Sequence, residues 1–99
     1  MARLNVSTPW GPAQTHQHFA EGIDFYSTAS HGGFKLSEER LAKIPAEWAR
    51  YAARWAGSPG WFEEDCAWAA VAITFPEAFP QRDWELAVKI GSQYLPKVA

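Results

Sequence analysis

The chain has 99 residues, of which 47% are hydrophobic and 20% are charged, and its formal net charge is -2. This size fits a single domain, residues 1–99, and the nearly balanced charge gives no electrostatic reason to expect direct binding to nucleic acid. No apolar stretch reaches the roughly 18 residues of a membrane span, and residues 1–6 lack the apolar run of a signal peptide, so we expect a cytoplasmic protein without membrane contact.

The first third of the chain favours turns and strands. Two prolines and a glycine within residues 8–12 of an N-terminal segment, 1–13, predict a rigid turn anchored by Trp10. Residues 14–37 then predict a three-stranded antiparallel meander, because short runs alternate with glycine. The expected strands are residues 14–21, 23–30 and 33–37, with reversals at Gly22 and at residues 31–33.

The middle strand of this meander has two different faces. Ile23 and Phe25 share one face, because successive side chains along a strand point to opposite sides. Asp24 and Tyr26 share the other face. We expect the face with Ile23 and Phe25 to meet the core.

The remaining residues, 38–95, predict three to four helices. Ser37 is a suitable N-cap for a short helix that ends before Pro45. A second helix over residues 46–56 is amphipathic, and a fourth covers roughly residues 81–94. Between them, a third helix opens near the acidic residues 63–65 and runs from Cys66 to Ile73.

The third helix is expected to be the most buried one, because it is apolar on two faces. The sequence therefore predicts an α+β fold in which an N-terminal three-stranded antiparallel sheet packs against three to four C-terminal helices. An aromatic content of 15% predicts a core rich in rings.

Hydroxyl groups and an imidazole gather in residues 26–33. A serine nucleophile needs a histidine within hydrogen-bond reach, and the neighbours Ser30 and His31 do not by themselves establish that geometry. Ser30 and His31, together with a carboxylate from Glu64 or Asp65, are the candidate catalytic residues if the protein is an enzyme. The simpler interpretation is a tight hairpin whose glycines supply positive φ angles at Gly32 and Gly33.

The acidic residues before the third helix allow two further interpretations. Glu64 or Asp65 could hold His31 or a backbone amide of the Gly32–Gly33 reversal. Cys66, the single cysteine, could be a thiolate with His31 as its base. Its spacing with the apolar positions of the third helix predicts a buried and unreactive thiol instead.

His16 and His18 lie two residues apart, so on a strand they project from one face. A zinc site needs a third or fourth ligand, and His31 and Asp24 are the only nearby suggestions. We expect a solvated polar face here, with no metal and no other cofactor.

The tryptophans divide into two groups. Four match helical apolar stripes and are expected in the core: Trp48, Trp55, Trp68 and Trp84. Trp10 and Trp61 lie in turn-rich segments, where a partly exposed indole can anchor a partner protein or, equally well, pack over the edge of the core. The predicted binding residues are Trp10, Tyr26, His31, Trp61 and Glu64.

Three sequence blocks carry a resemblance: residues 8–13, residues 22–37, which contain FYSTASHGG, and residues 60–68, GWFEEDCAW. In them the chain resembles an uncharacterised domain found in proteins of bacterial plasmids, phages and integrated elements. The resemblance implies no known chemistry. Small proteins of such elements often bind host machinery, including CRISPR effectors.

We therefore expect a non-catalytic protein-binding module of a mobile genetic element, located in the bacterial cytoplasm. Its expected partner is a host protein or protein complex, and its expected effect is to modulate or inhibit a host system such as CRISPR defence. The alternative is a small enzyme that uses Ser30, His31 and a carboxylate of Glu64 or Asp65.

Overall fold

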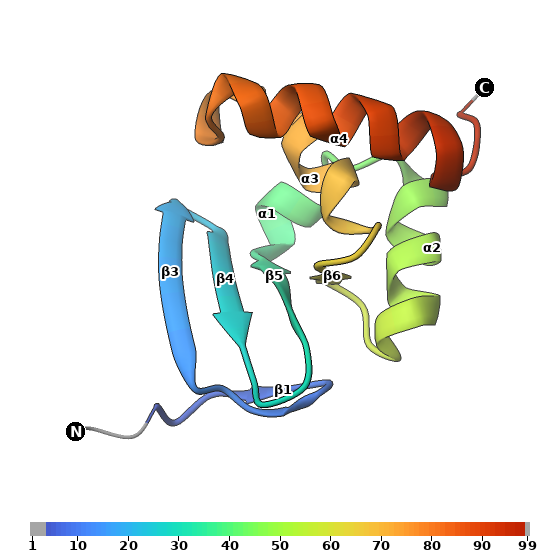
Figure 1. The fold of residues 1–99 in the computed structure, drawn as a ribbon. Coiled ribbons are helices and arrows are strands. Elements are labelled where there is room, and N and C mark those ends of the chain that lie inside the picture. Colours follow the sequence, from blue (N-terminus) through green and yellow to red (C-terminus); the bar gives the residue numbers. More distant parts are fainter. Residues whose placement is uncertain (1–3, 99) are drawn as a thin grey trace.

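The computed structural model describes residues 4–98 and has an α+β fold with two antiparallel sheets and four α-helices (Figure 1). The larger sheet has the strand order β3-β4-β5-β6. Its strands are β3 (Thr15–Ala20), β4 (Ile23–Ser27), β5 (Gly32–Leu36) and β6 (Trp61–Glu63). The predicted α+β class is confirmed, whereas the prediction of a three-stranded sheet missed the fourth strand. Residues 1–3 of the expected segment 1–13, and residue 99, lie outside the described residues.

The helices are α1 (Glu38–Leu41), α2 (Ala46–Ala56), α3 (Trp68–Thr74) and α4 (Gln81–Tyr94), with a short 3-10 helix, η1 (Pro76–Ala78), between the last two. The bounds of α2 and α4 agree with the prediction. Ser37 caps α1 as expected, because its Oγ accepts a hydrogen bond of 3.2 Å from the backbone N–H of Arg40. Within residues 4–98, no helix combines the length and apolar character that a membrane span requires.

Strand β6 explains why the third helix begins later than predicted. Phe62 lies opposite Phe34 of β5, and bulky aromatic residues fit the pleated surface of a strand. Glu63 ends the strand, and its carboxylate accepts hydrogen bonds from the backbone N–H groups of the next turn: Asp65, Cys66 and Ala67. These bonds turn the chain from strand to helix, so α3 starts at Trp68 and not near Glu63.

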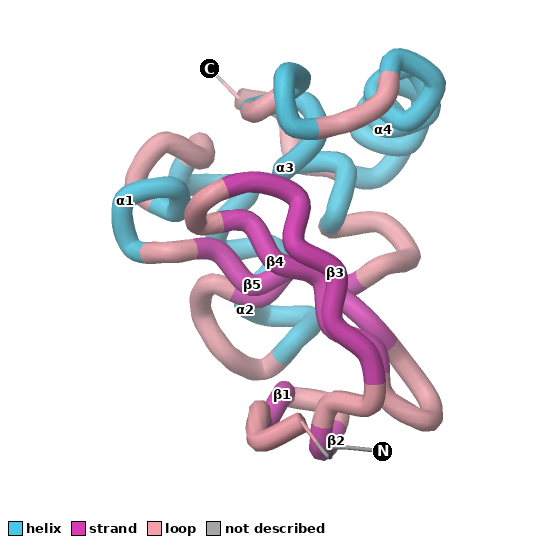
Figure 2. The backbone as a smooth tube through the Cα atoms, turned by 90° about the vertical axis from the view of Figure 1, so that its left-hand side faces the viewer, coloured by secondary structure: helices cyan, strands magenta, loops and turns pink. Residues whose placement is uncertain are grey.

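The N-terminal segment forms a small hairpin of β1 (Ser7–Thr8) and β2 (Gly11–Pro12), which confirms the predicted tight turn around Trp10. Thr8 Oγ1 fixes this turn, because it donates to the carbonyl of Gly11 at 2.7 Å and accepts from the N–H of Trp10 at 3.1 Å. Figures 1 and 2 show that the hairpin lies at the end of the molecule opposite α4.

The core lies between the sheet and α3. As predicted, α3 is the most buried helix, and Ala69, Ala70, Val71 and Ala72 have no exposed surface. Ile23 of β4 is also completely buried, which confirms the predicted inner face of that strand. Helix α4 then covers α3 on the side away from the sheet (Figure 1). The aromatic part of the core is centred on Phe34, whose ring contacts those of Phe19, Phe25 and Phe79.

Trp55 is the main departure from the expected core. Its side chain is 67% exposed, whereas the other three tryptophans of the helical stripes, Trp48, Trp68 and Trp84, are half-buried. Helix α2 stands beside β6 at the edge of the sheet, and Ala52 is its only fully buried residue (Figure 1). A helix in this position buries a narrow strip, so the ring of Trp55 in its last turn remains in solvent.

Candidate functional site

A cavity of about 550 Å³ is lined by side chains of the N-terminal hairpin, the reversal before β5, α2, the connection from β6 to α3 and the last turn of α4. This volume is in the range of small-ligand sites, about 300–1,000 Å³. Four aromatic rings, two carboxylates, an imidazole and a thiol line it. We call it the aromatic pocket; its residues are Trp10, His31, Tyr51, Trp55, Glu63, Asp65, Cys66 and Tyr94.

The fold brings these side chains from distant parts of the sequence. Tyr51 and Trp55 are four residues apart on α2 and therefore share a helix face, with their ring centroids 6.4 Å apart. Trp10 comes from the hairpin, and its ring meets Trp61 edge-on at 5.7 Å. Tyr94 belongs to the last turn of α4 and is 54% exposed. The pocket therefore has aromatic walls with an open side.

The electrostatic character of the aromatic pocket is negative. Burial, together with the carboxylates of Glu63 and Asp65, raises the pKa of the Cys66 thiol. Burial and the nearby Cys66 and Glu63 likewise raise the pKa of the Tyr51 phenol. Both groups are therefore neutral near pH 7, and the two acidic residues have no ion-pair partner among residues 4–98.

Cys66 is not the core residue that its spacing predicted. It is half-buried and lines the aromatic pocket. The reason is that residue 66 lies in the turn before α3, so it does not share a helix face with Ala69 and Ala70. Its raised pKa also argues against the thiolate nucleophile with His31 as base that the sequence left open, because less thiolate is present at a given pH.

The reversal between β4 and β5 is built by Thr28 rather than by glycines. Thr28 Oγ1 accepts hydrogen bonds from the backbone N–H groups of Ser30 and His31 and donates to the carbonyl of His31 at 2.8 Å. The positive φ angles expected at Gly32 and Gly33 are absent. Both glycines lie in β5, where they are needed for close packing.

Gly33 is the clearest case of this close packing. A Cβ atom at this position would clash with Cη2 of Trp10 and would lie 2.7 Å from the carbonyl oxygen of Phe62. At Gly32, a Cβ atom would lie 2.9 Å from Cζ of Phe25. The glycines therefore let the Trp10 ring and the neighbouring strand approach the backbone of β5.

The catalytic alternative of Ser30, His31 and Glu64 does not form a hydrogen-bonded set in the described part of the chain. His31 lines the aromatic pocket, but Ser30 and Glu64 do not. Glu64 is tied to the reversal through its backbone, because its N–H donates to the carbonyl of Gly32 at 2.9 Å. The link expected between the acidic segment and the reversal thus exists, but the carboxylate does not make it.

Three predicted binding residues meet on the outer face of the sheet. Trp61 contacts both Trp10 and Tyr26, with centroid distances of 5.7 Å and 5.9 Å. Trp61 is only 7% exposed, so of the two interpretations that the sequence allowed, the structure supports packing against the core and not a partly exposed anchor. Pairing in β6 and the ring of Trp10 cover it. Trp10 itself remains half-buried and reaches the pocket.

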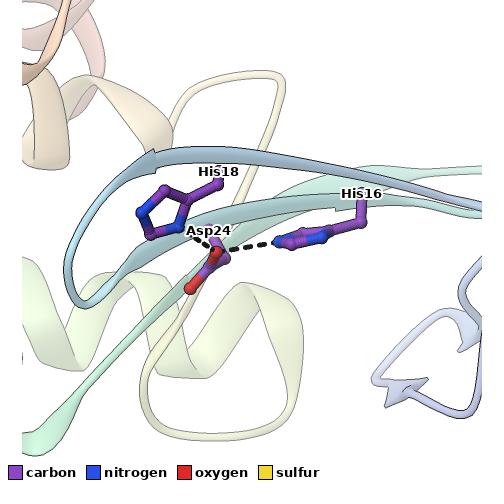
Figure 3. Close-up of side chains that lie close together, drawn as sticks. All are labelled: His16, His18 and Asp24. Atoms are coloured by element: carbon purple, nitrogen blue, oxygen red, sulfur yellow. Dashed lines mark hydrogen bonds and ion pairs between the residues drawn. The ribbon is translucent and has the colours of Figure 1, made fainter.

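The histidines of β3 meet the carboxylate of β4 on the same outer face (Figure 3). His16 Nε2 and His18 Nδ1 lie 2.8 Å and 2.9 Å from one oxygen of Asp24. Burial raises the pKa of Asp24, but the hydrogen bonds and charges of the two histidines outweigh burial, so that the pKa is lowered. Of the two third ligands that the sequence suggested, Asp24 joins the histidines, while His31 lies in the aromatic pocket.

Several pocket residues were missed by the sequence analysis: Tyr51, Trp55, Glu63 and Tyr94. The ring pair at i and i+4 was visible in the sequence, but the same spacing is typical of a core stripe. Only the position of α2 at the sheet edge separates these two interpretations.

Comparisons with known proteins identify one family. The family model described as Domain of unknown function (DUF7007) matches residues 3–98. The chain therefore belongs to this family, which agrees with its resemblance to an uncharacterised small domain. Neither a curated protein nor a solved structure matches the chain.

Proposed function

We propose that this domain, whose family has no assigned function, is a non-catalytic protein-binding module that receives a basic side chain of its partner in the aromatic pocket. The observation that carries the proposal is the combination of four aromatic rings with two carboxylates around one cavity. Aromatic faces attract cations through the ring quadrupole, and carboxylates add direct charge attraction.

Arginine is the side chain that this pocket fits best. Its planar guanidinium stacks on aromatic rings and pairs with carboxylates, whereas the lysine ammonium is a compact and strongly hydrated charge. Trp55 and Tyr94 offer exposed rings at the open side, and Asp65 is exposed beside them. Exposed tryptophan and tyrosine are also the residue types enriched in binding hot spots.

An NMR titration with a short peptide that contains one arginine tests the pocket directly. We expect the peptide to shift the indole N–H signals of Trp10 and Trp55. A peptide with citrulline, which keeps the shape but lacks the charge, should leave them unchanged. Trp55→Ala should abolish the response of Trp10, whereas Leu86→Ala, which truncates an exposed side chain of α4 outside the pocket, should preserve it.

The carboxylates are tested by a second pair of variants. Asp65→Asn should weaken binding of the arginine peptide, while Glu85→Gln, an exposed carboxylate outside the pocket, should not. An equal response to the citrulline peptide, or binding that is unchanged in both Trp55→Ala and Asp65→Asn, would contradict a cation-binding pocket.

We also propose that the module belongs to a mobile genetic element and modulates or inhibits a host protein or complex, such as a CRISPR-type defence system. The support is the resemblance of the chain to a domain found in proteins of such elements, and the sequence blocks that carry this resemblance also supply pocket residues. The FYSTASHGG block contains His31, and the GWFEEDCAW block contains Glu63, Asp65 and Cys66.

Affinity capture from a lysate of the bacterial host tests this partner class. A tagged wild-type protein should retain one stoichiometric host protein, and the purified partner should bind wild type and Leu86→Ala but not Trp55→Ala. A partner that binds the wild type and both variants equally would refute the assignment of the pocket. Turnover of a small molecule that is lost in His31→Ala would instead favour the enzymatic alternative.

A further inference from the structure

We propose that His16, His18 and Asp24 form a binding site for a divalent transition-metal ion of the zinc type, independent of the aromatic pocket and of the function proposed for it. The expectation of no metal in the sequence analysis rested on the lack of a convincing full ligand set, because the sequence could only suggest Asp24 or His31 as a third ligand. The pairing of β3 with β4 supplies this ligand, because it sets His18 directly opposite Asp24.

The hairpin of β3 and β4 orients the side chains of His16, His18 and Asp24 toward one point (Figure 3). His16 and His18 alternate along β3, so both leave the same face of the sheet, and Asp24 leaves that face from β4. One ligand atom from each residue lies within 4.8 Å of the other two. The strand pairing that the structure already has therefore brings the three side chains together.

The distances suit a metal after small side-chain rotations. Zinc bonds to histidine nitrogen and carboxylate oxygen are about 2.0–2.2 Å long, which sets neighbouring tetrahedral ligand atoms roughly 3.3 Å apart. Metal binding therefore lengthens the two N···O distances of 2.8 Å and 2.9 Å by about half an ångström, and it brings the two histidine nitrogens, which lie within 4.8 Å of each other, to a similar separation.

The surroundings hold the ligands and leave solvent access. The ring of His16 stacks on Tyr26 at a centroid distance of 4.8 Å and an interplanar angle of 17°, which restricts its orientation. Lys35 faces Asp24 in the register of β4 and β5, but its Nζ lies over the ring of Trp61 and does not occupy the site. Because His18 is 61% exposed, a water or a partner side chain can complete the coordination.

The donor set selects the class of metal. Two imidazole nitrogens and one carboxylate oxygen suit zinc and other first-row transition ions, whereas calcium and magnesium prefer oxygen ligands alone. Three protein ligands with an open position are typical of zinc sites that bind water or substrate, while structural zinc sites use four protein ligands.

Cobalt and zinc titrations of the tag-free, chelator-treated protein at about pH 7.5 test the proposal. We expect one zinc ion per chain by calorimetry, and visible absorption bands from bound cobalt that report nitrogen and oxygen ligands. His16→Gln, His18→Gln and Asp24→Asn should each weaken zinc binding about 10-fold or more.

His31 provides the matched control, since it is the third of the three histidines in the chain and lies away from the cluster. His31→Gln should bind zinc like the wild type. Imidazole NMR signals of the two cluster histidines should move on adding zinc, while the signal of His31 should not.

Absence of zinc binding would overturn the proposal and leave a metal-free cluster of two histidines hydrogen-bonded to one carboxylate. Binding that survives Asp24→Asn and both histidine substitutions would place the metal elsewhere and overturn it as well. Far-UV circular dichroism of each variant distinguishes loss of ligands from loss of the fold.

Discussion

Gly33 gives the sharpest prediction for a single side chain. Gly33→Ala should lower the free energy of unfolding by about 1–3 kcal/mol, because overpacking forces neighbours to move. The added Cβ would meet the Trp10 ring and the backbone carbonyl of Phe62. Urea denaturation measures the effect, with Ser30→Ala on the exposed reversal as a control that should change it by less than about 0.5 kcal/mol.

Adding Trp10→Ala to Gly33→Ala tests the explanation. Removal of the ring relieves one of the two close contacts, but the carbonyl of Phe62 is backbone and cannot move aside. The double variant should therefore remain less stable than Trp10→Ala alone. Equal stability of these two proteins would show that the carbonyl contact is harmless.

The pH dependence of Asp24 follows from its lowered pKa. A carboxyl group whose pKa is lower in the folded state than its ordinary value of 3.8 stabilises the fold at pH values above that ordinary pKa. This stabilisation disappears as the pH falls through the lower folded-state pKa. The difference in unfolding free energy between metal-free wild type and Asp24→Asn should thus shrink between about pH 5 and about pH 1. A constant difference over this range would contradict the hydrogen bonds of His16 and His18 to this carboxylate.

Cys66 should react slowly with a disulfide reagent at about pH 8, because burial and two neighbouring carboxylates raise its pKa and lower the thiolate fraction. Asp65→Asn removes one of these negative charges and should speed the reaction. Stopped-flow absorbance measures both rates, and the urea-unfolded chain gives the reference. A native rate that matches the unfolded one would contradict the raised pKa.

For single residues, the sequence predicted which face of a strand a side chain occupies. It did not predict contacts between residues that are far apart in the chain. The inner face of Ile23 and the outer face of Asp24 follow from the period of a strand. The role of Gly33 does not, because the Trp10 ring that presses on it lies 23 positions earlier in the chain. The exposure of Trp55 depends in the same way on where α2 packs.

The turn from β6 into α3 depends on one carboxylate. Glu63→Ala should lower the free energy of unfolding by about 1–2 kcal/mol, because three backbone N–H groups lose their acceptor. The neighbouring Glu64 is the matched control: its carboxylate forms no hydrogen bond within residues 4–98, so Glu64→Ala should be nearly neutral. Thermal unfolding of both variants makes the comparison, and equal melting temperatures would refute this role of Glu63.

Helix bounds were predictable where local signals agree. Helix α2 lies between Pro45 and Gly57, whose φ of 81° ends it, and α4 begins after Pro80. The start of α3 was not predictable in this way. Three acidic residues before an apolar run are typical of a helix start, but the free edge of β5 recruits Trp61 and Phe62 into a strand.

The core continues from the sheet into the helices, which predicts one cooperative unfolding transition for the domain. Phe34 and Phe62 of the sheet belong to the same buried cluster as Val71 of α3 and Ala87 of α4. Far-UV and near-UV circular dichroism should therefore give one common unfolding midpoint in urea. Val71→Ala should lower the midpoints measured by the two signals by the same amount. Separate midpoints would show that the sheet and the helices unfold independently.

The class of fold was predictable from the switch between strand-like and helix-like patterns near Leu36. The aromatic pocket was not, because no local pattern brings the hairpin, α2 and the end of α4 together. These contacts join residues far apart in sequence, and only packing of the complete chain determines them.

Strand β3 forms an edge of the larger sheet, so among residues 4–98 only β4 pairs with it. An edge of this kind presents backbone groups that can recruit a strand of another molecule and start aggregation. The exposed residues of β3, Thr15 to His18, are all polar, which disfavours a dry contact between two such edges. Polarity along this strand therefore disfavours edge-to-edge association of two molecules, and apolar replacements there should promote it.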